Sequence, residues 1–335
     1  MKTKVNLMAV AVIAIAGLMI ASCGKKVDLT LHLKQGETFN QVLTTNQTLN
    51  QTIQGQQQGM NQTVTMGYTF DIDTVNTDGS ATITVTYRSV AMDQQSPAGS
   101  ISYDSENPPD TIPAGAEALA ALVGQSFQLL LSPSSEILDI QGADRMIANM
   151  MDALGMPNDS TTAAIREGLD KQFGTNAIKA SMFTILGVYP ERPVAVGDTW
   201  TKTGAVMAGL PLLERITYKL KNMEDSSALV EVNATLEPDP EAPPLMMGPV
   251  EIKYDVSGTQ TGTMQIDPTT GWVTQAAMTQ DASGNMNIEP SPQVPQGMSW
   301  PVTIHTEISL AEFPLGTETS GGADSTMADS SSMEH

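Results

Sequence analysis

Strict alternation of apolar and polar residues recurs along this chain, and it restricts the fold more than any other feature of the sequence. Apolar residues fall on every second position of YTFDI (68–72) and of ATITVTY (81–87). This period of two places them on one face of a β-strand. Between the two segments stands NTDGS (76–80), and Asp-Gly is typical of a tight hairpin turn. The sequence therefore predicts an antiparallel hairpin in a sheet that buries one face.

Three other segments have the same pattern. VDLTLHL (27–33) predicts a half-buried strand with its valine and leucines on one face. FQLLLSPSSEILDI (127–140) predicts a hairpin that turns at Ser132–Glu136, and TIHTEISLAEF (303–313) predicts a final strand. These segments lie far apart in the chain, so β structure is expected from one end of the folded part to the other.

A tract rich in Thr, Gln and Asn covers residues 39–74. Apolar residues recur through it, and β-branched threonine suits a pleated surface, so we expect two long β-arms. The segment QGQQQGM (54–60) supplies glycines for the turn between the arms. The alternative for residues 41–62 is a prion-like or disordered tract.

The alternation stops at residues 142–190, where helical spacing replaces it. Met146, Met150 and Met151 fall on one helical face, and NDSTTAAIREGLDKQF (158–173) predicts a second helix with Ser160 or Thr161 as its N-cap. A third helix is predicted for residues 176–187. A shorter helix is expected earlier, in AGAEALAALVG (114–124), where glycine ends it.

Short motifs from the first half of the chain return in the same order in the second half. QGETF (35–39) is followed later by VGDTW (196–200), and LLLSPSSEIL (129–138) by MQIDPTTGWV (264–273). A third pair joins the segments around residues 77–85 and 223–232. Three pairs in one order predict an internal duplication.

The expected fold class is therefore α+β, mainly antiparallel β. Two related β segments would form a curved sheet or two half-barrels, and the helical insertion would cover an open face or a cavity mouth. The predicted boundaries are a signal peptide at 1–22, a first β segment at 23–141, the insertion at 142–190, a second β segment at 191–314 and a disordered acidic tail at 315–335.

The N-terminus reads as a targeting segment. Two lysines precede an apolar stretch that ends in IASC, and Cys23 is the only cysteine. IASC resembles the bacterial lipobox, in which cleavage leaves the cysteine as a diacylated N-terminus, so a palmitate-type anchor at Cys23 is expected. Such an anchor would hold the protein on a membrane. The alternative is an uncleaved signal anchor or a free thiol.

The charge of the chain excludes several partners. The formal net charge is −21, which opposes binding to nucleic acid and to anionic lipid headgroups. Membrane association is expected from the lipid at Cys23 alone. Once Cys23 is acylated, the chain has no thiol left for an intramolecular disulfide.

We expect no catalytic site, no metal and no cofactor. The chain has three histidines, and the motifs GxSxG and HExxH are absent from it. His32 and His305 fall on the polar faces of predicted strands. Asp71 and Asp73 share one strand face, which leaves a carboxylate-based enzyme as a weaker alternative.

The segment YDSENPPDTIPAGAEALAALVGQSFQLLLSPSSEILDIQG (103–142), with the opening Gln/Thr-rich strands and the later VGDTW, resembles a bacterial family of unknown function. Its members occur in Bacteroidota lipoproteins and other secreted proteins. The resemblance covers roughly residues 28–312 and implies a secreted, mainly β envelope protein. It brings no catalytic residue with it. Because the resemblance is strongest there, the loop with Tyr103, Asp104 and Asp110 is a candidate functional site.

The methionines suggest a second candidate site. The chain has 21 methionines with 4% aromatic residues, and methionine repacks readily around apolar partners. Met146, Met150 and Met151 are therefore candidate ligand contacts; core filling and copper(I) binding are the alternatives.

We expect a non-enzymatic binder or carrier of an apolar or amphiphilic ligand. It would be an outer-membrane lipoprotein facing the periplasm. The alternative is a structural or protein-interaction lipoprotein with an unknown protein partner.

Overall fold

The computed structural model describes residues 26–157, 162–207, 210–242, 245–247, 250–290 and 294–313. The predicted signal peptide, Cys23, the N-cap candidates Ser160 and Thr161, and the tail at 315–335 lie outside the described residues.

The described part is built on one antiparallel sheet of thirteen strands. The strands are β1 (Thr38–Ile53), β2 (Gln56–Val75), β3 (Ala81–Ser96), β4 (Gly99–Asp104), β5 (Ser126–Leu131), β6 (Ile137–Gln141), β7 (Thr199–Met207), β8 (Pro211–Met223), β9 (Ala228–Pro238), β10 (Leu245–Met247), β11 (Val250–Ile266), β12 (Val273–Ile288) and β13 (Met298–Glu312). Their order is β6-β5-β3-β2-β1-β13-β12-β11-β9-β8-β7, with β4 beside β3 and β10 beside β11. β6 and β7 are therefore the two ends of an open sheet.

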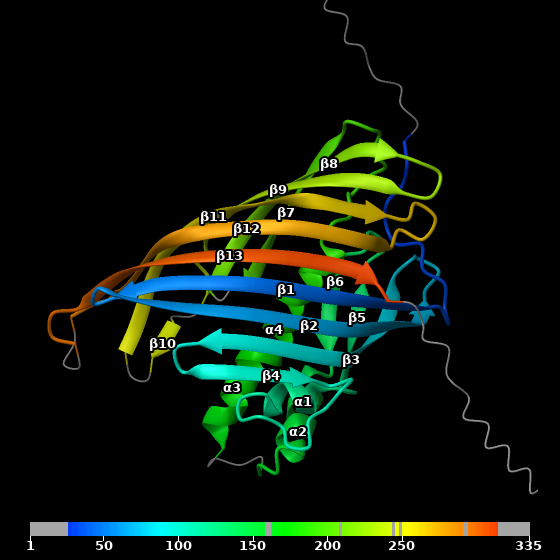
Figure 1. The fold of residues 1–335 in the computed structure, drawn as a ribbon. Helices are drawn as coiled ribbons and strands as arrows, with labels where there is room; N and C mark the ends of the chain where they lie inside the picture. The colour runs from blue at the N-terminus through cyan, green and yellow to red at the C-terminus, as the bar shows by residue number, and fades with distance from the viewer. Residues whose placement is uncertain are drawn as a thin grey trace, which may run out of the picture.

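Four short helices accompany the sheet: α1 (Glu117–Leu122), α2 (Ala143–Ala153), α3 (Ala163–Phe173) and α4 (Thr175–Leu186). In Figure 1 the long strands arch across one side of the molecule, and the helices gather behind and below them. α4 contacts both end strands, β6 and β7. The helices thus fill the concave side and bridge the gap between the two ends of the sheet.

The prediction of an α+β fold from two β segments is wrong, because the fold is mainly β and the sheet is continuous. β1 pairs with β13 from Gln41↔Glu312 to Gln51↔Val302, and this pairing joins the first half of the chain to the second. Because β1 and β13 are joined by antiparallel hydrogen bonds along these residues, the two halves of the chain form one sheet and not two separate half-barrels. The helical insertion is a minor element that covers the sheet.

The hairpins predicted from turn residues are present. Asn76 N–H donates to the Ser80 carbonyl at 2.8 Å in the β2–β3 turn. Residues 39–74 form β1 and β2, so the disordered alternative for 41–62 is wrong. Their turn consists of Gln54 and Gly55, with φ of 53° and 80°. Two residues at positive φ make the type I′ turn that matches the twist of a hairpin.

The repeated sequence motifs lie at corresponding places in the two halves of the chain. QGETF leads into β1 and VGDTW into β7, the first strand of each half. The hairpin turn in LLLSPSSEIL joins β5 to β6, and the turn in MQIDPTTGWV joins β11 to β12. The duplication itself stays a prediction.

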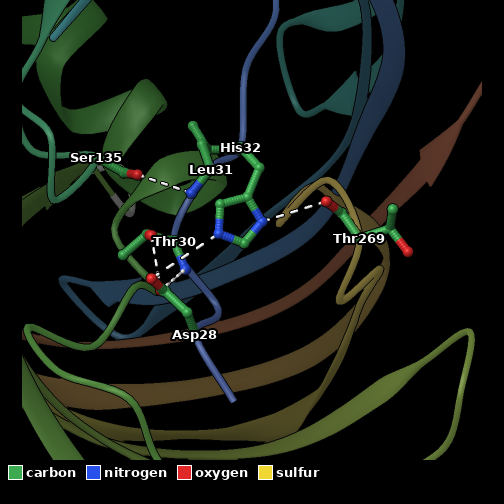
Figure 2. A network of polar contacts seen from close by, with 6 residues as sticks. All are labelled: Asp28, Thr30, Leu31, His32, Ser135 and Thr269. Atoms are coloured by element: carbon green, nitrogen blue, oxygen red, sulfur yellow. Dashed lines mark hydrogen bonds and ion pairs between the residues drawn. The ribbon is translucent and has the colours of Figure 1, made fainter. Parts of the chain in front are cut away.

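The first described residues form a strap across the ends of the hairpins. The predicted strand at 27–33 is wrong, because only Val27 makes a β-bridge, to Val194. The Leu31 amide instead donates to Ser135 Oγ at 2.9 Å, and His32 Nδ1 lies 3.2 Å from the Thr269 carbonyl (Figure 2). The side chains still alternate between buried and exposed, since the strap lies with one side on the hairpin ends. This is why its sequence reads like that of a strand.

The strap lies directly against the β11–β12 turn. The His32 amide donates to the Thr270 carbonyl at 2.8 Å, and Leu29 is fully buried. Gly271 has a φ of +73°, and a Cβ at this position would lie 2.0 Å from the Thr30 carbonyl oxygen. Glycine is therefore required here both by the backbone conformation and by the closeness of the strap.

Candidate functional site

A cavity of about 550 Å³ lies between the sheet and the helices. Its floor comes from β1, β2 and β3 and from β8, β11, β12 and β13, and its roof comes from α1, the end of α3 and α4. The volume falls in the range of roughly 300–1,000 Å³ that is usual for small-molecule sites. The cavity therefore has the size of a small-molecule binding site.

The floor of the cavity is arranged in rows that run across the strands. One row is apolar and crosses from β12 to β3, as each member pairs with the next: Met278, Ile308, Thr45, Val64 and Met92. Two positions away on each strand lies a polar row. A second apolar row follows it outside the cavity lining: Ala282, Ile304, Leu49 and Met60. A polar band thus crosses an otherwise apolar concave face.

We call this polar row the polar ladder. It runs through six neighbouring strands, in which each residue pairs directly with the next: Gln260, Gln280, Thr306, Gln47, Gln62 and Gln94. All six line the cavity. Cross-strand neighbours have Cβ atoms about 5 Å apart, so amide side chains in such a row can reach one another.

Hydrogen bonds link the ladder in pairs. Gln47 Nε2 donates to Thr306 Oγ1 at 3.3 Å, and Gln280 Nε2 donates to Gln260 Oε1 at 3.5 Å. Gln280 is 3% exposed, yet its Oε1 has no hydrogen-bond partner among the described residues. A buried amide oxygen without a partner costs free energy, so the ladder has capacity left for a ligand.

Glu214 lies on β8, with β9 between it and the β11 end of the ladder, and lines the same cavity. It is 3% exposed, and its Oε1 also has no partner among the described residues. Burial raises the pKa of this carboxyl to about 7, because the charged form loses its hydration. Burial, and then the charge of Glu214, raise the pKa of Tyr218 well above its usual value.

The roof of the cavity is formed mainly by small residues of α4. Ala177, Ala180 and Ser181 line it, and the Phe183 ring extends it toward β7. The Tyr68 hydroxyl lies 3.4 Å from Ser181 Oγ, and burial raises the pKa of Tyr68 to about 12. Small side chains on α4 leave the space that the cavity occupies.

The methionines predicted as ligand contacts lie elsewhere. Met146, Met150 and Met151 are at most 1% exposed and pack in the main core beneath α2. They are not among the residues that line the cavity. This placement agrees with the core-filling alternative, whereas the cavity uses other methionines, such as Met278 and Met92.

The predicted loop of interest lies outside the cavity as well. Tyr103 is 7% exposed and packs in the core at the end of β4. Asp104 accepts hydrogen bonds from the Asn107 side chain and the Glu106 amide, both at 2.9 Å, and these bonds lower its pKa. Asp110 is exposed. The structure does not bring these three side chains together with the cavity.

The acidic residues and the histidine considered as candidate catalytic groups form hydrogen bonds with residues of neighbouring strands. Asp71 accepts from Thr38 Oγ1 at 2.6 Å and Asp73 from Thr84 Oγ1 at 2.7 Å, and each is thus bound to a neighbouring strand. His305 Nδ1 lies 2.7 Å from Asp281 Oδ1 on the outer face.

Within the described ranges, no group of His, Cys, Asp and Glu could hold a metal ion. No helix in that part of the chain is both long and apolar enough to cross a membrane.

Sequence reasoning missed Glu214 and the polar ladder, although a signal for both was present. In PLLERITY (211–218), Glu214 holds a position of the apolar alternation, with Leu212 before it and Ile216 after it. Gln280 interrupts an apolar series in the same way, between Met278 and Ala282. A polar residue on the buried face of a strand marks a site that needs a partner.

Residues 78–273 match a family of unknown function (DUF6263). The chain belongs to this family. The match covers more than half of the chain and takes in the hairpins from β3 to β11 together with all four helices. The resemblance to a family of unknown function is thereby confirmed, and the family carries no stated activity.

Solved structures show only distant likeness to this DUF6263 chain. Lipovitellin, from a structure concerned with lipid–protein interactions, has 11% identity and a TM-score of 0.41, with 84% of this chain and 25% of the lipovitellin chain covered. This chain thus spans about a quarter of lipovitellin. The outer membrane protein opdK from Pseudomonas aeruginosa has 7% identity and a TM-score of 0.17, with 83% and 99% covered. No curated protein matches the chain. At these TM-scores the likeness supports no statement about ligand or activity.

Proposed function

We propose that this protein is a lipid-anchored, non-enzymatic binder or carrier of an apolar or amphiphilic molecule in the bacterial cell envelope. The observation that carries the proposal is the cavity of about 550 Å³ under α4, whose floor places the polar ladder beside an apolar surface that includes Met278, Ile308 and Val64. Apolar walls with a few placed polar groups are typical of sites for amphiphiles. The apolar surface would hold the chain of the ligand, and the polar groups would fix its orientation.

The charges in the cavity favour binding over catalysis. Of the described residues that line it, Glu214 and Lys171 carry charge. Lys171 Nζ is bound to Glu167 Oε1 at 2.8 Å on exposed α3, away from Glu214 in the floor. Hydrolysis by two carboxylates needs them about 5–9 Å apart around one bond, and Glu214 has no second carboxylate beside it among the lining residues.

The proposed location follows from the N-terminal sequence. A lipobox-like IASC segment would place an acyl anchor on Cys23, and the strap begins within a few residues of it. Lipid at that position would hold the sheet close to the membrane surface. The residue after the cysteine is glycine rather than aspartate, which favours the outer membrane, on its periplasmic side.

Filling the cavity should remove the bound lipid. Ala177→Trp puts an indole into the roof, where it occupies the space of two to three methylenes of a ligand. That loss of burial corresponds to about 2 kcal/mol, or about a thirtyfold weaker affinity. The full chain is purified in mild detergent, and the extracted lipid is quantified by mass spectrometry per mole of protein.

Asn176→Trp is the matched control, since Asn176 is the exposed neighbour of Ala177 on α4. It should retain as much lipid as the unaltered protein. Equal lipid recovery from Ala177→Trp and Asn176→Trp, or none from the unaltered protein, contradicts the proposed function.

A further inference from the structure

Glu214 is the feature of the cavity that ligand binding by apolar contacts leaves unexplained. The carboxyl is buried on the concave face, its Oε1 has no partner among the described residues, and it lines the cavity. Placing such a group in a sheet costs stability unless something compensates it. Its strand supplies apolar neighbours on the same face, Leu212 and Ile216.

The elements packed against Glu214 offer it no counter-charge. Its direct strand partners are Gly204 on β7 and Leu236 on β9. A Cβ at Gly204 would lie 2.5 Å from the Phe183 ring, so α4 covers this place with an aromatic side chain. Tyr218 lies four residues further along β8 on the same face, and it would add a second anion if it ionised.

Two lysines on elements around the cavity form ion pairs with other carboxylates. Lys171, on the roof side of the cavity, is bound to Glu167, and Lys202 on β7 lies 3.4 Å from Glu136. A compensating group for Glu214 must therefore arrive with the ligand. It must also fit between the floor and α4 with an apolar chain attached.

We propose that the ligand is a long-chain amphiphile whose polar end donates hydrogen bonds, an amine or an alcohol, and that Glu214 accepts them. This inference rests on the proposed function, because it names the chemistry of the ligand in the same cavity. An acyl carboxylate would place a second anion against Glu214, and an ester would bring acceptors only. An ammonium or hydroxyl group supplies the donor that the buried carboxyl lacks.

The second acceptor without a partner, Gln280 Oε1, is a separate point on the floor. β9 and β11 lie between β8 and β12, and Gln280 is also two residues away from the row of Glu214, so the two are about 16 Å apart along the sheet. One small head group cannot reach both. We assign the head group to Glu214 because a charged acceptor forms the stronger hydrogen bond.

Four sixteen-carbon probes test the proposal: hexadecylamine, hexadecanol, hexadecanoic acid and methyl hexadecanoate. Their affinities for the full chain are measured at pH 8 by displacement of the fluorescent probe N-phenyl-1-naphthylamine. We expect the amine to bind about ten- to a hundredfold tighter than the acid, with the alcohol between them, since a charge-assisted bond to a buried group is worth about 1.5–3 kcal/mol. Tighter binding of the acid or the ester than of the amine and the alcohol overturns the inference.

Variants separate the role of Glu214 from that of the cavity. Glu214→Gln should reduce the preference for the amine over the acid to within about threefold while the alcohol still binds, because a neutral amide oxygen still accepts a hydrogen bond. Glu237→Gln, on the exposed face of β9, should leave the preference unchanged. Retention of the full preference for the amine in Glu214→Gln overturns the assignment.

The two proposals fail in different ways. If none of the four probes displaces the dye, the proposed function fails and the inference fails with it. If all four bind with equal affinity, the cavity binds apolar chains and only the inference about the head group is wrong.

Discussion

The stability advantage of Glu214→Gln over the unaltered protein should grow by about 3 kcal/mol between pH 4.5 and pH 8. The pKa of Glu214 is about 7 in the folded protein, against 4.5 in the unfolded chain. Because the folded pKa is the higher one, the contribution of the protonated Glu214 to stability is fully present below pH 4.5 and is lost as the pH rises through 7. One pKa unit corresponds to about 1.4 kcal/mol, which gives the expected size.

The measurement is urea unfolding of both proteins at a series of pH values, with the difference in unfolding free energy plotted against pH. Other carboxyl groups titrate in both proteins and cancel in this difference. Glu237→Gln on the exposed face of β9 should give a difference that does not change with pH. A flat difference for Glu214→Gln would mean that its carboxyl is hydrated or paired in the folded state.

Trp272→Ala should lower the free energy of unfolding by about 3–5 kcal/mol, as is usual when a buried tryptophan is truncated. Trp272 is 1% exposed at the β11–β12 turn. Its ring stacks on Phe39 at a centroid distance of 4.4 Å and meets Phe70 edge-on at 5.1 Å. The substitution would leave a cavity under the turn to which the strap is bound.

Trp272→Phe separates packing from polarity at the same position. The indole Nε1 is buried with no hydrogen-bond partner among the described residues, and phenylalanine removes that donor while it keeps most of the ring contact. We expect less than half of the loss seen for Trp272→Ala in urea unfolding. A loss below about 1 kcal/mol for Trp272→Ala would show that this end of the sheet is not closely packed.

Local features of the fold were predictable because their causes are local in the sequence. The β2–β3 hairpin is specified by alternation on both sides of Asp78-Gly79, and the β5–β6 hairpin by its serine- and proline-rich turn. Helices α2, α3 and α4 follow from apolar spacing over a few turns. In each case the residues that decide the structure lie within about twenty positions of one another.

The continuous sheet could not be predicted in this way. It depends on β1 pairing with β13, residues that are more than 200 positions apart, and no turn residue specifies that register. In the strap, by contrast, a sequence pattern predicts a strand that does not form. Residues 27–33 alternate like a strand, but a segment lying across hairpin ends buries alternate side chains for the same geometrical reason.

The candidate site was only partly accessible to sequence reasoning. A cavity under the helical insertion was among the expectations, but the methionines proposed as ligand contacts do not line the cavity that the structure shows: Met150 and Met151 pack in the core. The polar ladder arises from the register of six strands, and single-strand patterns do not reveal which glutamines become neighbours. Glu214 is identifiable only once its strand face is known to be buried.

Photolabelling tests most directly whether the cavity holds an amphiphile. The full chain is irradiated with a sixteen-carbon alcohol that carries a diazirine in its chain, and labelled residues are located by peptide mass spectrometry, with unlabelled hexadecanol as competitor. The account predicts competable labels on lining residues such as Val64, Met278 and Ala177. Labels confined to the outer face of the sheet, for example at Asn233 and Thr235, or labels that hexadecanol does not suppress, would contradict it.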